Sequence, residues 1–417
     1  MTRQTADCFA VGDRLLGAAE ALELIAERVV AVTEAESVPL GQALGRVLAA
    51  DLIAGFDVPP HDNAAVDGFA LRLSDLAADR PTRLPVAGRA AAGRPPVELA
   101  PGSATRIFTG AVLPVGADAI VMQEHAREAD GWVEVPQGLE PFANCRRAGE
   151  DVRQGEAVLR RGHRLRPQDL GLAAELGRAR LQVHRPLRVA VFSSGDELRQ
   201  PGEALAPGAV YDANRFLLIA LLEELGAQVS DRGILADRAE PVRQALAEAA
   251  RDQHLILTSG GVSMGEEDHL RAAVEALGRL HFWRLAIKPG RPLAVGQLGG
   301  AAFCGLPGNP VAAMVCFLRF ARPLALRLAG ASAIEPHAYP LPAGFAFRKR
   351  AGRREWLRAR IVRGQDGAVS LERFAREGSG ILTSLVAADG LVELPEDLTD
   401  VRPGDLVAFL PFYGMCG

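Results

Sequence analysis

Between residues 187 and 330 the chain alternates short apolar runs with helix-like segments, and this rhythm constrains the fold more than any other feature. Strand character covers 187–192, 228–235 and 255–257, and helical character covers 214–225, 240–251 and 267–277. Two of these helices run into a glycine, Gly226 or Gly278, and glycine commonly ends a helix. Repeated strand–helix order is typical of parallel βαβ units with helices on both faces of the sheet. The sequence therefore predicts a parallel α/β domain.

The regions on either side of this domain lack the strand–helix alternation and have different sequence patterns. Helices are expected at 18–29, where Asp13 can cap the start, at 42–50, and at 167–176, where a proline suits the first turn. Short apolar runs separated by Pro and Gly predict a β-rich domain over 56–142. After Gly330 the helical pattern stops, and four short runs predict a small β-barrel or sandwich: 357–362, 368–374, 391–394 and 406–410.

Length and composition set limits on the function. A chain of 417 residues with 48% hydrophobic and 24% charged residues fits a globular protein of several domains. A formal net charge of −4 gives no reason to expect nucleic acid or an anionic membrane as a partner. No signal peptide is recognisable at the N-terminus, and arginines interrupt the most apolar stretch, 311–328. The five cysteines are scattered, which favours reduced thiols in the cytoplasm over a zinc site or disulfides.

Polar residues and glycines follow the predicted strands, at the sheet edge where open α/β proteins bind ligands. They fall into carboxylates, glycine-rich turns and cations. In chain order they are Ser194, Gly195, Asp196, Glu197, Asp237, Ser259, Gly260, Gly261, Asp268, Lys288, Arg291, Pro307, Gly308 and Pro310.

Together these residues suit a phosphorylated ligand with Mg²⁺. Glycine turns let backbone N–H groups approach a phosphate, cations add positive charge, and carboxylates are the hard oxygen ligands that Mg²⁺ prefers. Each residue taken singly has an ordinary structural explanation, as a helix cap, a tight turn or a solvated lysine. The chain contains no GxGxxG and no GxxxxGK[ST] sequence, so neither a dinucleotide fold nor a P-loop kinase is supported.

Two segments outside the α/β region also concentrate Pro, Asn, Asp and Gly. They are 59–70, around Asp67, and 106–118, which contains Thr109. Structured turns in a β-rich domain would account for both equally well.

These two segments, with 193–198, 258–265, 286–292 and 305–311, resemble the molybdopterin molybdenumtransferase family, which includes bacterial MoeA and the gephyrin E domain. The resemblance extends over nearly the whole chain. It implies a segmented elongated domain (1–50 and 146–184), an inserted β-rich domain (51–145), the parallel α/β molybdopterin-binding domain (185–330) and a C-terminal β-barrel domain (331–417). It also implies a homodimer in which each active site is shared between subunits, the inserted domain of one facing the α/β domain of the other.

The implied reaction is the insertion of molybdate into adenylylated molybdopterin, with Mg²⁺ required and AMP released. Carried over by position, the catalytic residues are Asp67, Thr109, Asp151, Glu197, Asp237 and Asp268. Mg²⁺ would be bound by Glu197, Asp237 and Asp268. The substrate-binding residues would be Ser194, Gly195, Ser259, Gly260, Gly261, Lys288, Arg291, Pro307, Gly308 and Pro310. Expected partners are a molybdopterin adenylyltransferase and downstream cofactor-handling proteins, with no nucleic acid and no membrane.

The chain departs from the family pattern at three places. Ala64 and Val66 flank Asp67 where Ser and Met are common, Ala312 replaces a serine near the anion site, and Arg291 replaces a lysine. Because the acids are intact, activity is expected. A basic stretch at 348–360 is expected to be a solvated face, with docking of substrate or a partner as the alternative.

Two other functions compete with this assignment. An adenylyltransferase of the same pathway would need little more than the α/β domain, so the rest of the chain argues against it. A non-catalytic scaffold is the second, and the intact acids Asp67, Asp237 and Asp268 argue against it.

Overall fold

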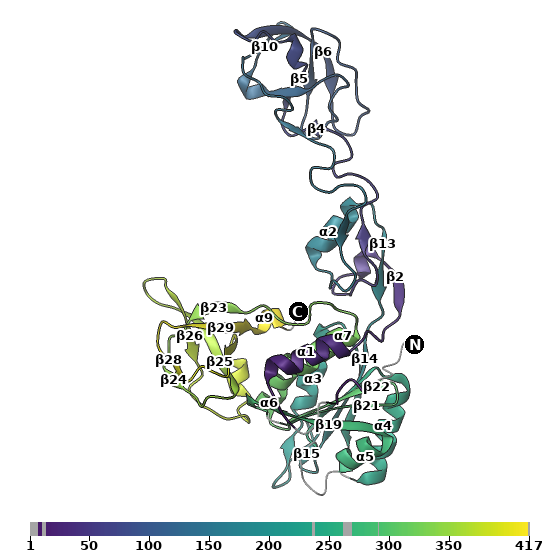
Figure 1. The fold of residues 1–417 in the computed structure, drawn as a ribbon, viewed down its shortest axis with the longest axis vertical. Helices are drawn as coiled ribbons and strands as arrows, with labels where there is room; N and C mark the ends of the chain where they lie inside the picture. Colours follow the sequence, from purple (N-terminus) through teal and green to yellow (C-terminus); the bar gives the residue numbers. More distant parts are fainter. Residues whose placement is uncertain (1–6, 11–13, 236–237, 262–268, 291, 416–417) are drawn as a thin grey trace. The chain divides into compact units, whose positions relative to one another are not determined.

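The computed structural model describes residues 7–10, 14–235, 238–261, 269–290 and 292–415. The chain forms two compact units (Figure 1). Unit 1 comprises Met1–Ala50, Arg161–Leu170 and Arg180–Gly417, and unit 2 comprises Asp51–Arg160 and Gly171–Ala179. Within the described ranges, no helix combines the length and the apolar character needed to cross a membrane.

A seven-stranded sheet forms the centre of unit 1. Its strands, in spatial order, are β1 (Leu15–Leu16), β19 (Gly278–Leu285), β21 (Pro292–Leu298), β22 (Ala301–Leu306), β18 (Leu255–Ser259), β14 (Arg188–Ser194) and β17 (Gln228–Leu235). The last four are mutually parallel, as predicted. A purely parallel sheet is wrong, because β21 runs antiparallel to both of its neighbours. Gly299, with φ +58°, lies in the tight turn that joins β21 to β22 as a hairpin.

Helices cover both faces of this sheet, as predicted. Helices α4 (Ala239–Asp252) and α5 (His269–Leu277) pack on one face together with Ala190 and Phe192. Helices α1 (Ala18–Arg28), α3 (Asn214–Glu224), α6 (Pro310–Cys316) and α7 (Arg322–Leu328) pack on the other face together with Val189 and Val191. Successive residues of β14 therefore point to opposite faces, and both sets are buried. This two-sided burial explains the unbroken apolar run that marked the strand in the sequence.

Two local predictions at the N-terminus need correction. Gly17 occupies the N-cap position of α1 without a side-chain hydrogen bond, and Asp13 lies outside the described residues. The helix expected at 42–50 is absent from this described segment, apart from the end of a short 3-10 turn, Leu40–Gln42. Its backbone groups bond to distant segments instead: Gly45 N–H donates to Leu165 O and Leu48 N–H to His163 O. Tertiary pairing therefore overrides the local helical preference.

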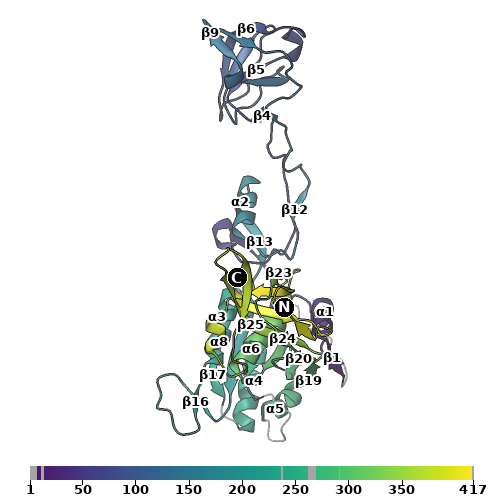
Figure 2. The same cartoon turned by 90° about the vertical axis from the view of Figure 1, so that its left-hand side faces the viewer.

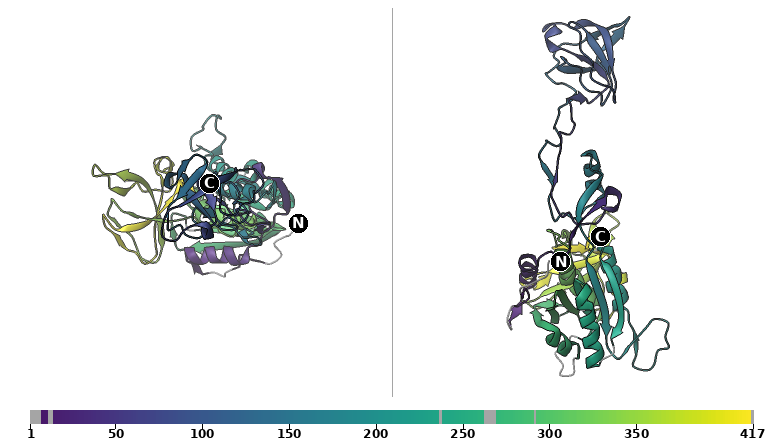
Figure 3. Two further views of the ribbon diagram at one scale, coloured as in Figure 1. Left: turned by 90° about the horizontal axis from the view of Figure 1, so that it is seen from above. Right: turned by 90° about the vertical axis from the view of Figure 1, so that its right-hand side faces the viewer.

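The C-terminal region of unit 1 is a second sheet, shown in yellow beside the green α/β part in Figure 3. Its strand order is β20 (Ile287–Lys288), β25 (Arg354–Arg363), β27 (Gly390–Leu394), β29 (Leu406–Pro411) and β23 (Tyr339–Pro342), and β26 (Val369–Arg373) pairs with β25. Two short helices, α8 (Thr383–Val386) and α9 (Phe412–Met415), lie beyond Gly330, where helices were not expected. Closure of the sheet into a barrel stays a prediction.

Unit 2 is β-rich, as expected. Its main sheet has the order β8 (Ala119–Met122), β5 (Gly68–Leu71), β7 (Ala104–Ile107), β6 (Thr82–Ala90), β10 (Trp132–Val135) and β9 (Arg127–Ala129). A Cβ at Gly68 would lie 2.0 Å from Val121 O, so only glycine fits at the start of β5. The four-domain boundaries expected from the sequence stay a prediction.

A buried ion network joins the two sheets of unit 1. Arg319, with 5% of its side chain exposed, places Nη2 3.3 Å from Glu393 Oε2. The same carboxylate accepts hydrogen bonds from Trp356 Nε1 (2.7 Å) and Arg354 Nη1 (3.1 Å). Arg319 belongs to the helical segment between α6 and α7, whereas the other three residues lie on β25 and β27. The network therefore fixes the C-terminal sheet against the α/β part.

We predict that Glu393→Ala lowers the free energy of unfolding by about 3–5 kcal/mol, because it removes the carboxylate that pairs directly with the buried Arg319. Urea denaturation followed by tryptophan fluorescence measures this change. Glu372→Ala is the matched control: it breaks the exposed Arg360–Glu372 pair, whose side chains are 58% and 53% exposed, and should cost less than about 1 kcal/mol. Equal losses in the two variants would contradict the role assigned to Glu393.

Candidate functional site

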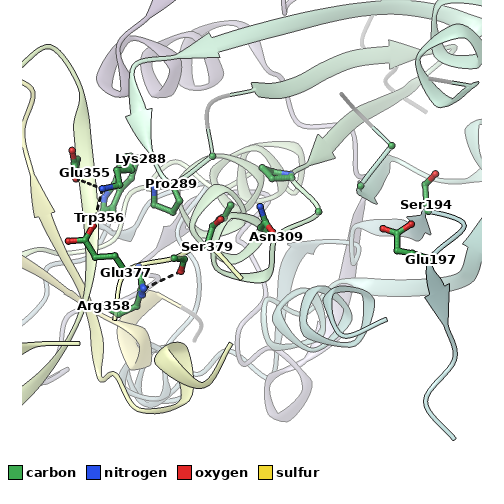
Figure 4. A pocket seen from close by; sticks show the side chains of 18 of the residues that line it. Ser194, Glu197, Lys288, Pro289, Asn309, Glu355, Trp356, Arg358, Glu377 and Ser379 are labelled. Carbon is green, nitrogen blue, oxygen red and sulfur yellow. Dashed lines mark hydrogen bonds and ion pairs between the residues drawn. The ribbon is translucent and has the colours of Figure 1, made fainter. Parts of the chain in front are cut away.

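A cavity of about 1060 Å³ opens at the carboxyl edge of the parallel strands in unit 1 (Figure 4). Turns of the α/β part form one side, and the C-terminal sheet with its loops forms the other. The lining residues are Ser194, Gly195, Asp196, Glu197, Gly260, Gly261, Lys288, Pro289, Gly290, Pro307, Gly308, Asn309, Ala312, Glu355, Trp356, Leu357, Arg358, Glu377, Gly378 and Ser379.

The first wall is the loop after β14. Ser194 ends the strand and is buried, whereas the Glu197 side chain is exposed to solvent. The loop folds back on itself, because Leu198 N–H donates to Gly195 O (3.1 Å). It is also tied to a short parallel pair, β15 (Leu198–Arg199) with β16 (Val210–Tyr211), and Figure 2 shows the long connection between these two strands projecting from the unit. This arrangement presents the Glu197 carboxylate at the rim of the cavity.

The second wall consists of two turns that approach closely. Gly260 (φ +81°) and Gly261 (φ +64°) follow β18 in the left-handed region. A Cβ at Gly260 would lie 2.5 Å from Ser194 O, and one at Gly261 would lie 2.7 Å from Ser194 Oγ. A Cβ at Gly308 would lie 3.8 Å from Gly260 Cα. Side chains at Gly260 and Gly261 would therefore collide with Ser194, whereas Gly308 lies at ordinary contact distance from Gly260.

Lys288 lies at the junction of the two sheets. It ends β20, which pairs in parallel with Arg354 and Glu355 of β25. Its Nζ lies 3.5 Å from Glu355 Oε2 and 3.5 Å from Glu377 Oε2. Although partial burial raises the pKa of Glu377, the charges of Lys288 and Arg373 outweigh it and leave that pKa below its usual value. Lys288 is 43% exposed, so it can still reach an anion in the cavity.

Cys316 packs beneath the turn that follows Lys288. A Cβ at Gly290 would lie 2.4 Å from its Sγ, so this turn also needs glycine. Burial raises the pKa of the Cys316 thiol to about 12. The thiol is therefore neutral at physiological pH and serves as packing rather than as a nucleophile.

The C-terminal wall contributes residues that the sequence reasoning did not assign to the site. Arg358 is buried, and burial lowers its pKa although it stays a cation. Its Nε donates to Ser384 Oγ (3.0 Å), and Nη2 donates to the carbonyls of Arg376 (3.1 Å) and Gly378 (3.3 Å). Trp356 lies on the same strand.

The basic stretch at 348–360 is therefore only partly a solvated face. Arg348 and Arg360 are exposed and pair with Asp400 and Glu372. Lys349 and Arg358 are buried and hydrogen bond to backbone carbonyls. The solvated-face interpretation is wrong for this second pair.

The structure gathers many of the expected site residues at the cavity and leaves others apart. Those lining it are Ser194, Gly195, Asp196, Glu197, Gly260, Gly261, Lys288, Pro307 and Gly308. Ser259 is buried at the end of β18, and Pro310 begins α6, so both lie next to lining residues. Asp237, Asp268 and Arg291 lie outside the described residues, and Asp67, Thr109 and Asp151 belong to unit 2.

The expected metal site can be examined only in part. In the part of the chain that the structure describes, no group of three or more His, Cys, Asp and Glu side chains is arranged to hold a metal ion. The expected Mg²⁺ ligands are Glu197, Asp237 and Asp268, and two of them fall outside that part. The metal site stays a prediction.

Asp67 and Thr109, 42 positions apart, meet in unit 2. Thr109 donates to Asp67 Oδ1 through both its backbone N–H (2.8 Å) and its hydroxyl (2.7 Å). The backbone hydrogen bond is the largest cause that lowers the pKa of Asp67, followed by the hydroxyl and the charge of Arg106. Asp67 is thus held as a carboxylate. Asp151, in the same unit, has an exposed side chain, and its backbone N–H donates to Val58 O (3.0 Å).

Family models match three consecutive regions of the chain. The MoeA N-terminal region (domain I and II) matches residues 16–177, a probable molybdopterin binding domain matches 190–327, and the MoeA C-terminal region (domain IV) matches 340–412. The middle match contains the parallel strands and the glycine turns of the cavity.

Two relatives match over most of their length. A molybdopterin molybdenumtransferase of Haemophilus influenzae is 39% identical over 92% of this chain and 96% of its own. A molybdopterin molybdenumtransferase 2 of Mycobacterium tuberculosis is 38% identical over 88% and 93%. The crystal structure of the molybdopterin biosynthesis MoeA protein from Pyrococcus horikoshii OT3 superposes with a TM-score of 0.80 at 30% identity, covering 96% of this chain and 100% of that one.

The Asp67–Thr109 geometry predicts a measurable titration effect. Thr109→Val should raise the pKa of Asp67, because the hydroxyl hydrogen bond is lost while the backbone one remains. A carboxyl group with a depressed pKa stabilises the fold above its unfolded pKa, and this contribution disappears as the pH falls through the folded pKa. Relative to the wild type, the variant should therefore have a lower free energy of unfolding at neutral pH, and this difference should become smaller in acid.

Carboxyl-carbon NMR titration measures the Asp67 pKa directly. Thr82→Val is the control, because the Thr82 hydroxyl accepts from Ala77 N–H (2.8 Å) and does not contact Asp67. An unchanged Asp67 pKa in Thr109→Val would contradict the assigned hydrogen bond.

Proposed function

The chain belongs to the MoeA family of molybdopterin molybdenumtransferases, and from that premise we propose that it inserts molybdate into adenylylated molybdopterin and releases AMP. It is accordingly a transferase of molybdenum cofactor biosynthesis. The observation that carries the proposal is the convergence of Ser194, the Gly260–Gly261 turn and Lys288 on one cavity. This is the edge at which parallel α/β sheets bind phosphorylated ligands.

The size and chemistry of the cavity support this substrate. A volume of about 1060 Å³ reaches the upper end of ligand pockets and suits a pterin joined to a nucleotide. Backbone groups at the glycine turns can approach a phosphate without obstruction. Pro289 and Pro307 line the cavity and are partly exposed, so they offer apolar surface to a ring system.

Cations on the C-terminal side suit the oxyanion substrate. Lys288 is partly exposed and Arg358 is fixed by three hydrogen bonds, and both line the cavity. Molybdate and phosphate are tetrahedral oxyanions that ammonium and guanidinium groups bind by charge-assisted hydrogen bonds. Ala312 of α6 lines the cavity from the α/β side and offers no hydroxyl to the anion.

A magnesium requirement is part of the proposal. The carboxylates of Asp196 and Glu197 line the cavity and are hard oxygen donors, which fits Mg²⁺, with Asp237 and Asp268 as further ligands. When bound, Mg²⁺ would neutralise charge on the phosphoanhydride. The protein's own part is to bind the phosphates at the glycine turns, to hold the oxyanion near Lys288, and to present carboxylates that can orient water.

The second set of acids supports a shared active site. Asp67 is held ionised by Thr109, yet neither residue lines the cavity of unit 1. We propose that the protein is a cytoplasmic homodimer in which Asp67, Thr109 and Asp151 of one subunit complete the site of the other. Adenylylated substrate would come from a molybdopterin adenylyltransferase, and the product would pass to downstream cofactor-handling proteins.

AMP release from adenylylated molybdopterin tests the reaction. With Mg²⁺ present, we expect AMP to appear only when molybdate is added, and Asp237→Asn to abolish turnover while leaving the dimer intact. No AMP under either condition would overturn the proposal in favour of a binding scaffold. ATP consumption with unmodified molybdopterin would instead indicate an adenylyltransferase.

Complementation tests the shared site. Asp67→Asn and Glu197→Gln should each be inactive alone, because they remove acids from different units. Co-expressed differently tagged chains should recover about a quarter of wild-type activity, because half of the dimers then contain one intact site. Asp237→Asn combined with Glu197→Gln is the control and should stay inactive, because both changes affect the same half-site. If the mixture of Asp67→Asn and Glu197→Gln chains stayed as inactive as the control mixture, sharing of the active site between subunits would be contradicted.

A further inference from the structure

Asn214 is the first residue of α3 and lies directly behind the cavity. It is 9% exposed and is not one of the residues that line the wall. Its Nδ2 donates one hydrogen bond to Ser259 Oγ (2.8 Å) and another to Gly308 O (2.7 Å). Ser259 is the last residue of β18, where the Gly260–Gly261 turn begins, and Gly308 lies in the turn after β22. A single side-chain amide thus links both turns of the second wall.

The two turns are already close where Asn214 links them. Gly260 N–H donates to Leu306 O (3.1 Å), and Gly260 Cα faces Gly308 without an intervening side chain. Ser259 is 3% exposed, so its hydroxyl depends on a protein partner rather than on solvent. The spacing between the turns is therefore set by the β18–β22 pairing, which extends to Ser259 and Leu306, by the Gly260 hydrogen bond and by the Asn214 amide, which alone of these reaches Gly308.

Asn214 is itself rigidly held by its neighbours in the chain. Arg215 (3% exposed) forms an ion pair with Asp212 (1% exposed), with Nε 2.9 Å from Oδ2, and also pairs with Asp231 of β17. The Asp212 carboxylate accepts from Ser193 Oγ (2.9 Å) and from Arg215 N–H (3.2 Å). The turn at 212–215 is thus anchored to the end of β14, from which the Ser194–Glu197 wall begins.

From this arrangement we propose that Asn214 is a positioning residue, which sets the gap between the turns at 259–261 and 306–309 and thereby the affinity of the cavity for the phosphate part of its ligand. The proposal rests on the proposed function only for its choice of AMP as the ligand. Asparagine suits the position because a short side chain must supply two N–H donors to two oxygen acceptors. Alanine supplies none, and aspartate turns an oxygen toward the Gly308 carbonyl.

Two variants separate positioning from stability. Asn214→Asp keeps a polar side chain of the same shape, and a carboxylate in the first turn of α3 is favourable for the helix. Its oxygen can accept from the Ser259 hydroxyl but repels the Gly308 carbonyl, so the link is broken without a cavity. Asn214→Ala removes both hydrogen bonds. Leu218→Ala is the control, because Leu218 is a fully buried residue of the same helix whose apolar side chain forms no hydrogen bond to either turn.

Hydrogen–deuterium exchange gives the first result. We expect faster exchange at the 259–261 and 306–309 amides, above all at Gly260, in both Asn214 variants. Leu218→Ala should speed exchange within α3 and lower the melting temperature while leaving the Gly260 amide protected. Unchanged protection of the turns in Asn214→Ala would overturn the proposal, and this holds even if the protein proves to bind no AMP.

Ligand affinity gives the second result. By calorimetry with AMP and Mg²⁺, Asn214→Ala and Asn214→Asp should each weaken binding by about tenfold or more, the loss expected for one or two hydrogen bonds. In turnover the loss should fall on KM more than on kcat, since Asn214 does not touch the reacting atoms. Wild-type affinity in both variants, or a loss that follows the melting temperature as in Leu218→Ala, would contradict positioning. Failure of wild-type protein to release AMP would count against the proposed function alone.

Discussion

The close approach of backbone to backbone at the end of the parallel sheet is the constraint on which the site depends. Ser194, the Gly260–Gly261 turn and Gly308 meet so tightly that a Cβ at either of the first two glycines would fall within 2.7 Å of Ser194. Such packing is possible only because parallel strands end at one common edge and because glycine tolerates positive φ. The cavity floor is therefore made of main-chain groups, which suits a ligand rich in phosphate oxygens.

The C-terminal sheet completes the cavity because two kinds of interaction attach it to the α/β part. The β20–β25 pairing carries Lys288 to the rim, and the Arg319–Glu393 network holds Trp356 in the wall. Since burial of these charges is favourable only when they are paired, the network favours one arrangement of the two sheets. The basic stretch at 348–360, which was expected to be a solvated face, thus contributes to the architecture of the site.

Much of this could be predicted from the sequence, and the reasons are physical. Strands buried on both faces, such as β14 and β18, leave continuous apolar runs that can be recognised in the sequence, and α3 and β17 were placed almost to the residue. The hairpin that makes the sheet mixed was missed because its strands read like any buried strand. The helix at 42–50 was wrong because long-range hydrogen bonds replaced local ones. Arg358 and Asn214 were not assigned to the site because their importance comes from partners distant in the chain, whereas Asp67 and Thr109 entered only through resemblance to a family.

The central claim is that the cavity at the carboxyl edge of the sheet is where the oxyanion is received. A crystal structure of the protein soaked with molybdate, measured near the molybdenum absorption edge, tests it most directly. The account predicts an anomalous peak inside the cavity within hydrogen-bonding distance of Lys288 or Arg358, and loss of that peak in Lys288→Ala crystals if Lys288 is the ligand. A molybdenum peak elsewhere on the protein, with the cavity empty, would contradict it.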